Sequence, residues 1–492
     1  MCTPKLRILL LALVALLAMA LQSGAPGASA QGGWAVDAFA PAPDSTVYAL
    51  AVQPDGQILV GGDFAVLGGQ PRTSIGRLHP DGSLDEFFAP EALGRIYALA
   101  VQPDGSIIVA GALVALGGEP RMYIGRLAAD GGLDASFDPM PDGQVNALAL
   151  QPDGKIVLGG AFTSIAGQPC ARICRLHPDG APDESWVGST DADVLALALQ
   201  PDGAILLGGA FGTVNGEARS HIARVNASGV LDQGWQAETD GVVYVIVPQP
   251  DGSVLIGGAF GSVNGAPRAG LARLDSNGAL DEGFAPDLRG APQAPRVHTI
   301  ATDADGRIML GGVFFWLPDG AGNHLANLAI VEPDGALNPA GVLRTDGSVM
   351  ALALQGDGKL LVGGAFAELG SEARGMLGRL DAPTAAAQGL AFDADTRSAT
   401  WARSGSAPEV WRATLELSTD GVTYTALGEG ARTAGGWVWG DLALPPGRDL
   451  WLRARGYYAT GFGGGSGSLV ETTQQVYLAW DPIPHHVPIA TR

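Results

Sequence analysis

The stretch VQPDGQILVGGDF, residues 52–64, sets the pattern for most of the chain. Pro54 presets the backbone φ of the first turn position, Asp55 can bond its own backbone, and Gly56 can take the positive φ that closes a tight hairpin. The stretch therefore predicts two strands joined by a turn. The Asp-Gly pair is interpreted as a turn element and not as a chemical group of an active site.

Six related copies of this stretch follow. Counted from the Gln-Pro-Asp-Gly equivalent, the copies begin at residues 53, 102, 151, 200, 249, 303 and 355. A period of about 49 residues is typical of one supersecondary unit per repeat and not of one strand. The first copy holds four segments rich in Val, Ile, Leu and aromatics, which are VYALAVQ, QILVGGDF, SIGRLHP and SLDEFF. The paired glycines Gly61 and Gly62 indicate that a packed layer or another backbone comes close to the second strand.

Four antiparallel strands per copy, repeated seven times, predict an all-β chain with a seven-bladed β-propeller, and an open solenoid is the alternative. The two ends of the repeat favour the propeller. The seventh copy ends in MLGRLDAP, residues 376–383, and lacks a fourth strand. The segment WAVDAFAP, residues 34–41, resembles a fourth strand without a preceding copy. We therefore expect the N-terminal strand to complete the last blade, a ring closure that an open stack would not require.

A second pattern within the repeat pairs an arginine with an aspartate eight residues later. The sixth copy changes both positions together, to Ile330 and Asn338. Joint loss is expected of a partly buried ion pair, because removing one partner of a buried pair costs about 3 to 5 kcal/mol. Arg379 in the seventh copy has no downstream partner, so we predict that Asp37 supplies it. The other predicted pairs are Arg77 with Asp85, Arg126 with Asp134, Arg175 with Asp183, Arg224 with Asp232, and Arg273 with Asp281.

These copies resemble the delta-60 repeat, a bacterial β-propeller repeat of secreted and surface proteins. The resemblance covers roughly residues 31–382 and rests on seven matches to a QPDGKILVGG…R…RLnpDGsLD..F pattern. It implies a propeller and export, and it supplies no catalytic residues. The sixth copy departs most from the pattern, with the insert RGAPQAP and the segment FFWLPDGAGNHLANLAIV.

The N-terminal segment indicates export. Lys5 and Arg7 precede the apolar run ILLLALVALLAMAL, and a small-residue stretch ends in ASA, so residues 1–30 are interpreted as a signal peptide. The run of 14 apolar residues is shorter than the roughly 20 of a spanning helix, so no membrane span is expected in the mature form. The formal charge of -21 becomes -23 without the two cations, which disfavours nucleic acid as a partner. We expect a secreted or cell-surface protein.

A second domain is expected after the repeat. Residues 383–389 form a small-residue linker, and residues 390–480 hold six of the ten tryptophans in short alternating segments. Such segments predict an immunoglobulin- or fibronectin-like β-sandwich. Residues 481–492, which include a His-His pair without a third ligand nearby, are expected to form a disordered tail.

The cysteines Cys170 and Cys174 are expected to be free thiols. In an extended segment their α-carbons would lie about 13 Å apart, beyond the span of a disulfide, and pairing would require Cys170 to lie in a turn.

Candidate functional residues are sought where one copy differs from the others. The best candidate ligand-binding site is the loop of the sixth copy that carries Phe315, Trp316, Asn323 and His324, since aromatics on a loop can stack on sugars or peptides. Three histidines, His221, His298 and His324, occur singly, and we expect no metal or catalytic role for them. No metal site and no cofactor are expected. A calcium role for Asp303 and Asp305 is the less favoured alternative to a turn role.

Two hypotheses of function remain open from the sequence. The first is an exported non-enzymatic protein that serves as a binding, adhesive or scaffold module at or beyond the cell surface, with a surface glycan or protein as partner. The second is a propeller enzyme, a polysaccharide lyase or glycoside hydrolase, with its site at one mouth of the central channel. Paired carboxylates about 5 to 9.5 Å apart would favour the enzyme. The sequence contains no nucleophile elbow, zinc signature or dinucleotide fingerprint.

Overall fold

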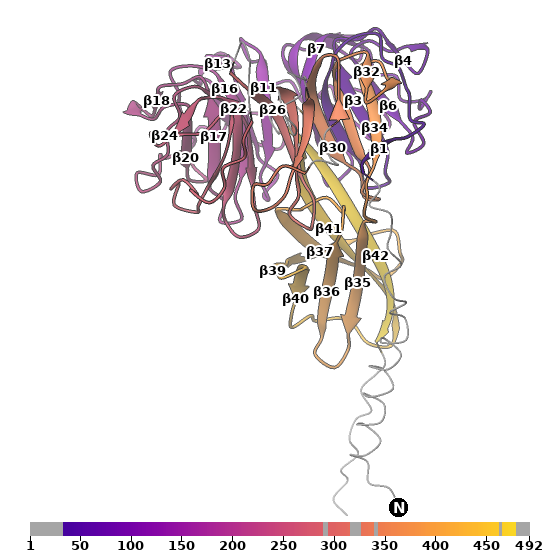
Figure 1. Cartoon of the computed structure of the whole chain (residues 1–492). Helices are drawn as coiled ribbons and strands as arrows, with labels where there is room; N and C mark the ends of the chain where they lie inside the picture. The colour runs from indigo at the N-terminus through magenta and orange to yellow at the C-terminus, as the bar shows by residue number, and fades with distance from the viewer. Residues whose placement is uncertain (1–32, 289–293, 315–325, 339–342, 462–464, 479–492) are drawn as a thin grey trace, which may run out of the picture.

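The computed structural model describes residues 33–288, 294–314, 326–338, 343–461 and 465–478, and its regular elements in these ranges are β-strands (Figure 1). Within the same ranges, no helix is long and apolar enough to span a membrane. The repeat region lies in the upper part of Figure 1, and the strands that follow it lie below.

Each copy of the repeat forms one antiparallel sheet, and we number the sheets by their copies. The first strands are β2 (Val47–Val52), β7 (Ala92–Val101), β11 (Val145–Leu150), β16 (Val194–Leu199), β21 (Val242–Pro248), β26 (Arg296–Thr302) and β30 (Ser348–Leu354). The second strands are β3 (Ile58–Gly62), β8 (Ile107–Leu116), β12 (Ile156–Gly160), β17 (Ile205–Gly209), β22 (Val254–Ala259), β27 (Ile308–Val313) and β31 (Leu360–Ala365). The third strands are β6 (Ile75–Leu78), β10 (Ile124–Leu127), β15 (Ile173–Leu176), β20 (Ile222–Val225), β25 (Leu271–Leu274), β28 (Asn327–Val331) and β34 (Leu377–Asp381).

Short strands connect the second and third strands of most sheets. Each is a hairpin of two strands with two residues in each strand. These hairpins are β4 (Val66–Leu67) with β5 (Gln70–Pro71), β13 (Ser164–Ile165) with β14 (Gln168–Pro169), β18 (Thr213–Val214) with β19 (Glu217–Ala218), β23 (Ser262–Val263) with β24 (Ala266–Pro267), and β32 (Glu368–Leu369) with β33 (Glu372–Ala373). In the second sheet β9 (Glu119–Pro120) pairs with the end of β8.

The predicted turn between the first and second strands is confirmed. Gly56 has a φ of 84°, and its N–H donates to the carbonyl of Gln53 at 2.9 Å. The Asp55 carboxylate accepts from the N–H of Gln57 at 3.1 Å, so this aspartate acts on its own turn.

The expected fourth strand is much shorter than the other three. In the first sheet it is the single bridge between Leu78 and Leu84, and five further copies have one equivalent bridge within the described residues. The chain leaves the ladder because the carboxylate of Asp85 accepts the N–H of Phe87 and bends the backbone. The seventh sheet gains its fourth strand from β1 (Ala35–Val36), whose residues pair antiparallel with Asp381 and Leu380.

The glycines of the second strands let neighbouring sheets approach. A Cβ on Gly61 would lie 2.7 Å from the Ile96 side chain of the second sheet, and a Cβ on Gly62 would collide with the carbonyl of Thr46. The same contact joins the seventh sheet to the first, where a Cβ on Gly363 would lie 2.8 Å from Val47. The first strands accordingly contact one another in the order β2, β7, β11, β16, β21, β26, β30 and again β2.

Two further sheets follow the repeat. One is ordered β35 (Ala387–Asp393), β36 (Ser398–Ser404), β40 (Gly436–Trp439) and β39 (Ala431–Thr433). The other is ordered β38 (Thr425–Glu429), β37 (Arg412–Ser418), β41 (Arg448–Thr460) and β42 (Ser466–Leu478). Their facing residues share one core, which includes Trp401, Trp437 and Trp439. Because β35 begins at Ala387, it starts within residues 383–389, which had been expected to be a linker.

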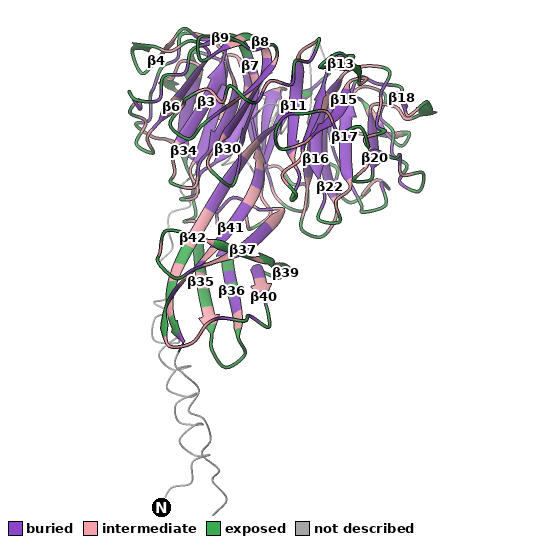
Figure 2. Cartoon of the chain, turned by 180° about the vertical axis from the view of Figure 1, so that it is seen from behind, coloured by how far each residue is buried: buried purple, intermediate pink, exposed green. Residues whose placement is uncertain are grey.

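The strands β41 and β42 extend beyond their own sheet into the repeat region. Figure 2 shows the upper ends of both strands buried between the sheets of the repeat, whereas β35 is largely exposed. Gly467 of β42 pairs with Ala100 of β7 in parallel, so the second sheet of the repeat and the β38–β37–β41–β42 sheet form one continuous sheet. The sequence pattern had indicated two separate domains and no such joint.

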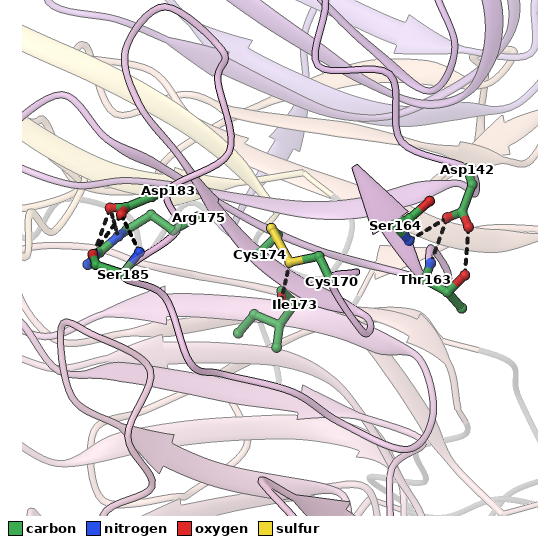
Figure 3. Close-up of a disulfide and its surroundings, with 9 residues drawn as sticks. All are labelled: Asp142, Thr163, Ser164, Cys170, Ile173, Cys174, Arg175, Asp183 and Ser185. Atoms are coloured by element: carbon green, nitrogen blue, oxygen red, sulfur yellow. Dashed lines mark hydrogen bonds and ion pairs between the residues drawn. A yellow bond between two sulfur atoms is a disulfide. The ribbon is translucent and has the colours of Figure 1, made fainter. Parts of the chain in front are cut away.

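The cysteines are joined by a disulfide, which contradicts the expectation of free thiols (Figure 3). Cys170 lies in the loop after β14, and Arg172 has a φ of 68°, so the segment is folded back instead of extended. The α-carbons are 5.8 Å apart as a result, a distance that a disulfide spans.

We predict that Asp37→Ala destabilises the protein by about 3 kcal/mol. The Asp37 carboxylate lies 2.7 Å from the guanidinium of Arg379, whose side chain is 8% exposed, so the variant leaves a buried cation without its partner. The double variant Arg379→Ile with Asp37→Asn copies the residues of the sixth copy, and it should lose less than the single variant. Urea denaturation measures the free energy of unfolding of both variants. Equal decreases in the single and the double variant would show that the ion pair between Arg379 and Asp37 contributes little.

We predict that peptide mapping under denaturing, non-reducing conditions finds Cys170 and Cys174 linked and unreactive toward iodoacetamide. For a closed loop of residues 170–174, replacing both cysteines by alanine should lower the free energy of unfolding by about 2 kcal/mol, because the unfolded chain regains loop entropy. Free alkylated thiols at both positions in the parent protein would contradict the bridge.

Candidate functional site

The loop that the sequence singled out cannot be assigned a geometry. Phe315, Trp316, Asn323 and His324 lie outside the described residues, as do residues 1–30 and 481–492.

The arginines and aspartates of the repeat lie together in each predicted pair. Their closest side-chain nitrogen and oxygen atoms are 2.6 to 2.9 Å apart, in Arg77–Asp85, Arg126–Asp134, Arg175–Asp183, Arg224–Asp232, Arg273–Asp281 and Arg379–Asp37. Figure 3 shows the third pair with Ser185, whose hydroxyl also donates to Asp183. For Asp183, burial raises the pKa, but hydrogen bonds from Ser185 and Lys155 and the charge of Arg175 outweigh it and hold the pKa well below its usual range.

Each of these arginines also reaches the next sheet. Arg77 donates from Nη1 to the carbonyl of Ala129 at 2.6 Å, and its guanidinium lies 4.4 Å from the centre of the Phe88 ring. Arg379 of the seventh sheet donates in the same way to the carbonyl of Pro80 in the first. We call this set of ion pair, inter-sheet hydrogen bond and aromatic contact the arginine clasp. Its satisfied contacts make it a structural device and not a site for a ligand.

The sixth sheet lacks the clasp. Ile330 occupies the arginine position opposite Met309, and the Asn338 amide donates to Glu332 at 2.6 Å. The sixth and seventh sheets instead meet the strands that follow the repeat, where Arg307 donates to the hydroxyl of Thr384 at 2.6 Å.

The ends of β41 and β42 lie against the first strands of the repeat. We call residues 457–461 and 465–469 of these strands the anchoring hairpin. It forms hydrogen bonds to four sheets. The hydroxyl of Thr460 donates to the carbonyl of Leu50 at 2.7 Å, the hydroxyl of Tyr458 donates to the carbonyl of Leu354 at 2.7 Å, and the hydroxyl of Ser466 accepts from the N–H of Leu99 at 3.0 Å. The backbone carbonyl of Gly461 accepts from the hydroxyl of Thr299 at 2.9 Å. These bonds are buried, so the hairpin is fixed by both hydrogen bonding and packing.

A small apolar cavity remains between the anchoring hairpin and the third and fourth sheets. Its volume is about 70 Å³, and Leu148, Leu199, Trp411 and Tyr457 contribute to its wall. An engineered apolar cavity that binds benzene measures about 150 Å³, roughly twice this volume.

Asp303 and Asp305 join the repeat to the sheets that follow it. Asp303 is fully buried and lies 2.8 Å from Arg307, while Asp305 accepts the N–H of Gly405 at 2.7 Å. Burial raises the pKa of Asp303 to about 6 despite the opposing charge of Arg307. Among the described residues, no three side chains of His, Cys, Asp or Glu are grouped so that they could hold a metal ion.

Two of the three single histidines can be placed. His221 contacts the carbonyl of Thr239 through Nδ1 at 2.9 Å. His298 is 8% exposed, and burial lowers its pKa to about 4, so it is neutral near pH 7. His298 packs edge-on against Tyr244 with ring centres 5.5 Å apart, and this contact leads to a wider arrangement.

A set of unlike side chains lies near the bulges of the first strands, whereas the anchoring hairpin bonds to residues further along those strands. Every first strand has a β-bulge, which is one residue that has no partner in the pairing with the second strand. The bulged residue is the second or third of the strand, except in the longer strand β7, where it is the sixth. Five of these residues are partly exposed, while the strand residues that follow them are mostly buried. We call the seven bulged residues the open rim, and they are Tyr48, Tyr97, Asn146, Leu195, Tyr244, His298 and Met350.

The charged groups beside the open rim are mostly paired. Arg95 lies 3.0 Å from Asp63, and this carboxylate, together with Tyr97, raises the pKa of the guanidinium. Arg172 lies 3.7 Å from Asp193. Arg296, at the start of β26, is exposed and stands outside the ring itself.

The open rim was missed in the sequence, although a signal was present. The aligned segments YALAVQ, YALAVQ, NALALQ, LALALQ, YVIVPQ, HTIATD and MALALQ differ mostly at their first residue. The bulge explains why this position does not follow the alternation of side chains between the two faces of the strand. A bulge arises from the pairing of two strands, so the sequence of one strand does not reveal it.

We predict a pH-dependent stability difference between the parent protein and Asp303→Asn. The folded pKa of Asp303 is about 6 against an ordinary value of 3.8, so the folded state keeps a proton that the unfolded state releases. The stabilising contribution is complete below pH 4 and is lost as pH rises through 6, by about 3 kcal/mol. Denaturation series at pH 4, 5, 6 and 7 should show the parent losing stability relative to the variant over this window; a constant difference would contradict the raised pKa.

One comparison with known proteins matches the repeat region. Five segments match the model of a family described as "Domain of unknown function (DUF5122) beta-propeller", at residues 53–88, 102–137, 151–185, 200–234 and 249–284. No curated protein matches the chain.

Two solved structures of proteins of unknown function are similar at low level. One is from Bacteroides caccae, with 12% identity, a TM-score of 0.33, and coverage of 57% of this chain and 91% of that chain. The other is from Bacteroides thetaiotaomicron VPI-5482, with 12% identity, a TM-score of 0.33, and coverage of 68% of this chain and 82% of that chain. The matched family segments and the all-β structure together identify the chain as a β-propeller repeat protein.

Proposed function

We propose that the chain is an exported, non-enzymatic binding or scaffold module built on a closed seven-bladed β-propeller of the delta-60 type. Three contacts support closure between the last and first blades: the β1–β34 pairing, the packing of Gly363 on Val47, and the bond from Arg379 to Pro80. The two sheets after the repeat, which share a tryptophan-rich core, form an immunoglobulin- or fibronectin-like sandwich in this proposal.

The observation that carries the proposal is the anchoring hairpin. Its buried hydrogen bonds to the first, second, sixth and seventh blades join the sandwich to the propeller as one rigid body. One mouth of the channel is thereby closed, and the opposite face is held at a fixed distance from the sandwich. A rigid support that presents one free face suits a protein that binds a partner.

Export is supported by two features. The segment of residues 1–30 has the pattern of a signal peptide, and the Cys170–Cys174 disulfide suits an oxidising compartment outside the cytoplasm. The module would then work as a secreted or surface-associated protein.

The enzymatic alternative has weaker support. Two carboxylates beside the open rim, Asp63 and Asp193, belong to different blades, the first and the fourth, and each lies beside an arginine. Asp303 is buried at the joint with the sandwich, away from that rim. A pair of carboxylates converging on a bond to be cleaved is the feature that would favour hydrolysis.

We predict that the purified full chain binds saturably to at least one class on an array of glycans, bacterial surface polymers and surface proteins. Binding should persist after chelation of calcium, because the described residues hold no metal-ligand cluster. An acidic protein of similar net charge is the matched control for nonspecific adsorption. Absence of any binding, or release of new reducing ends from a polymer, would overturn the non-enzymatic binding function.

A further inference from the structure

We infer that the open rim is a saccharide-binding site, in which the tyrosines of the first, second and fifth blades stack on the faces of uncharged sugar rings. This inference rests on the proposed binding function, and it specifies the face and the class of ligand. It is argued from described residues alone, and the sixth-copy loop lies outside them.

The propeller provides its own internal comparison. Positions that hold the blades together repeat from copy to copy, as the arginine clasp and the paired glycines do. The bulged position of the first strand differs in most copies, although its backbone geometry is the same in all seven. A bulge releases its residue from the ladder and redirects its side chain, and bulges are frequent beside functional sites. Packing alone would favour the same small or apolar residue in every blade.

The side chains at the open rim have the chemistry that sugars require. The rings of Tyr48 and Tyr97 meet edge to face with centres 5.4 Å apart, and Tyr244 meets His298 in the same way at 5.5 Å. Aromatic faces pack on the C–H faces of sugars, and phenol hydroxyls donate to and accept from sugar hydroxyls. The hydroxyls of Tyr48 and Tyr244 make no hydrogen bond to the described protein groups, so both are available to a ligand.

The remaining members of the rim fix its shape. Asn146 donates to the carbonyl of Val194 in the next blade at 3.2 Å and accepts from Gln144 at 3.2 Å. His298 is buried, and its pKa of about 4 keeps it neutral at the pH of most extracellular media. Preorganised side chains on rigid strands lose little freedom on binding, which favours affinity.

The charges around the rim favour an uncharged ligand. Arg95 is paired with Asp63, and Arg172 lies near Asp193, so these cations are compensated. The chain as a whole carries a formal charge of -21, which repels acidic polymers at a distance. Arg296 is exposed and stands two residues before His298, and it defines the competing possibility of an acidic sugar.

The test is isothermal titration calorimetry of the full chain. The ligands are neutral hexasaccharides of the malto-, cello-, manno- and xylo- series and the acidic hexagalacturonate. Tyr48→Ala with Tyr97→Ala should weaken binding of the best neutral ligand by at least about tenfold, and Tyr48→Phe, which keeps the ring, by about threefold. Tyr477→Ala is the matched control, because Tyr477 is 63% exposed at the far end of β42. It should leave binding unchanged.

Hydrogen–deuterium exchange keeps the test valid if a variant folds poorly. In the parent protein, the ligand should slow exchange in residues 47–52, 96–101 and 243–248 and leave the sandwich unchanged. Two outcomes would overturn the rim site and still agree with the proposed binding function. One is saturable binding to an array component that the tyrosine variants do not weaken. The other is slower hydrogen exchange that is confined to the sandwich. Preference for hexagalacturonate that depends on Arg296 would also overturn the rim site, whereas failure to bind any array component would refute the proposed function itself.

Discussion

The arginine on the third strand of each blade is the interaction on which the repeat region depends. Its guanidinium has five donors, and one side chain therefore serves its own aspartate, a carbonyl of the next blade and an aromatic face at once. Because each clasp ties one blade to the next, the stability of any blade is shared with its neighbours. Asp37 must come from the N-terminal strand for the same reason, since Arg379 would otherwise be a buried cation without a partner.

The sixth blade shows what replaces the clasp when it is absent. Ile330 stands where the other copies have the arginine, and Arg307 of this copy pairs with Asp303 and donates to Thr384 in the segment after the repeat. The backbone of Ala304 donates to Ala407, and Glu409 donates to Thr302, so a short β-bridge crosses the joint. The sheets that follow the repeat are thus attached at the copy that lacks the clasp.

The anchoring hairpin gives the two faces of the propeller different roles in our proposal. On one face, hydroxyl groups of Thr460, Ser466 and Ser468 saturate the backbone ends of the first strands, so that face is closed by the protein itself. At the open rim, the bulged positions carry three tyrosines, and the hydroxyls of Tyr48 and Tyr244 make no hydrogen bond to the described protein groups. The residues of the arginine clasp and the paired glycines repeat because every blade needs the same contacts. The residues of the open rim do not make these contacts, so in our proposal their side chains differ to suit a ligand.

The sequence by itself determined the strands, the turns and the partners of the arginines. These follow from local rules: Pro-Asp-Gly closes a hairpin, alternating apolar residues pair in strands, and a repeated eight-residue spacing links Arg to Asp. Tertiary structure alone decided the Cys170–Cys174 bridge, the insertion of β41 and β42, and the open rim. Each of these depends on where distant segments meet or on how a strand slips by one residue against its partner. The sequence pattern does not predict these contacts, because they form between distant segments only after the blades have assembled.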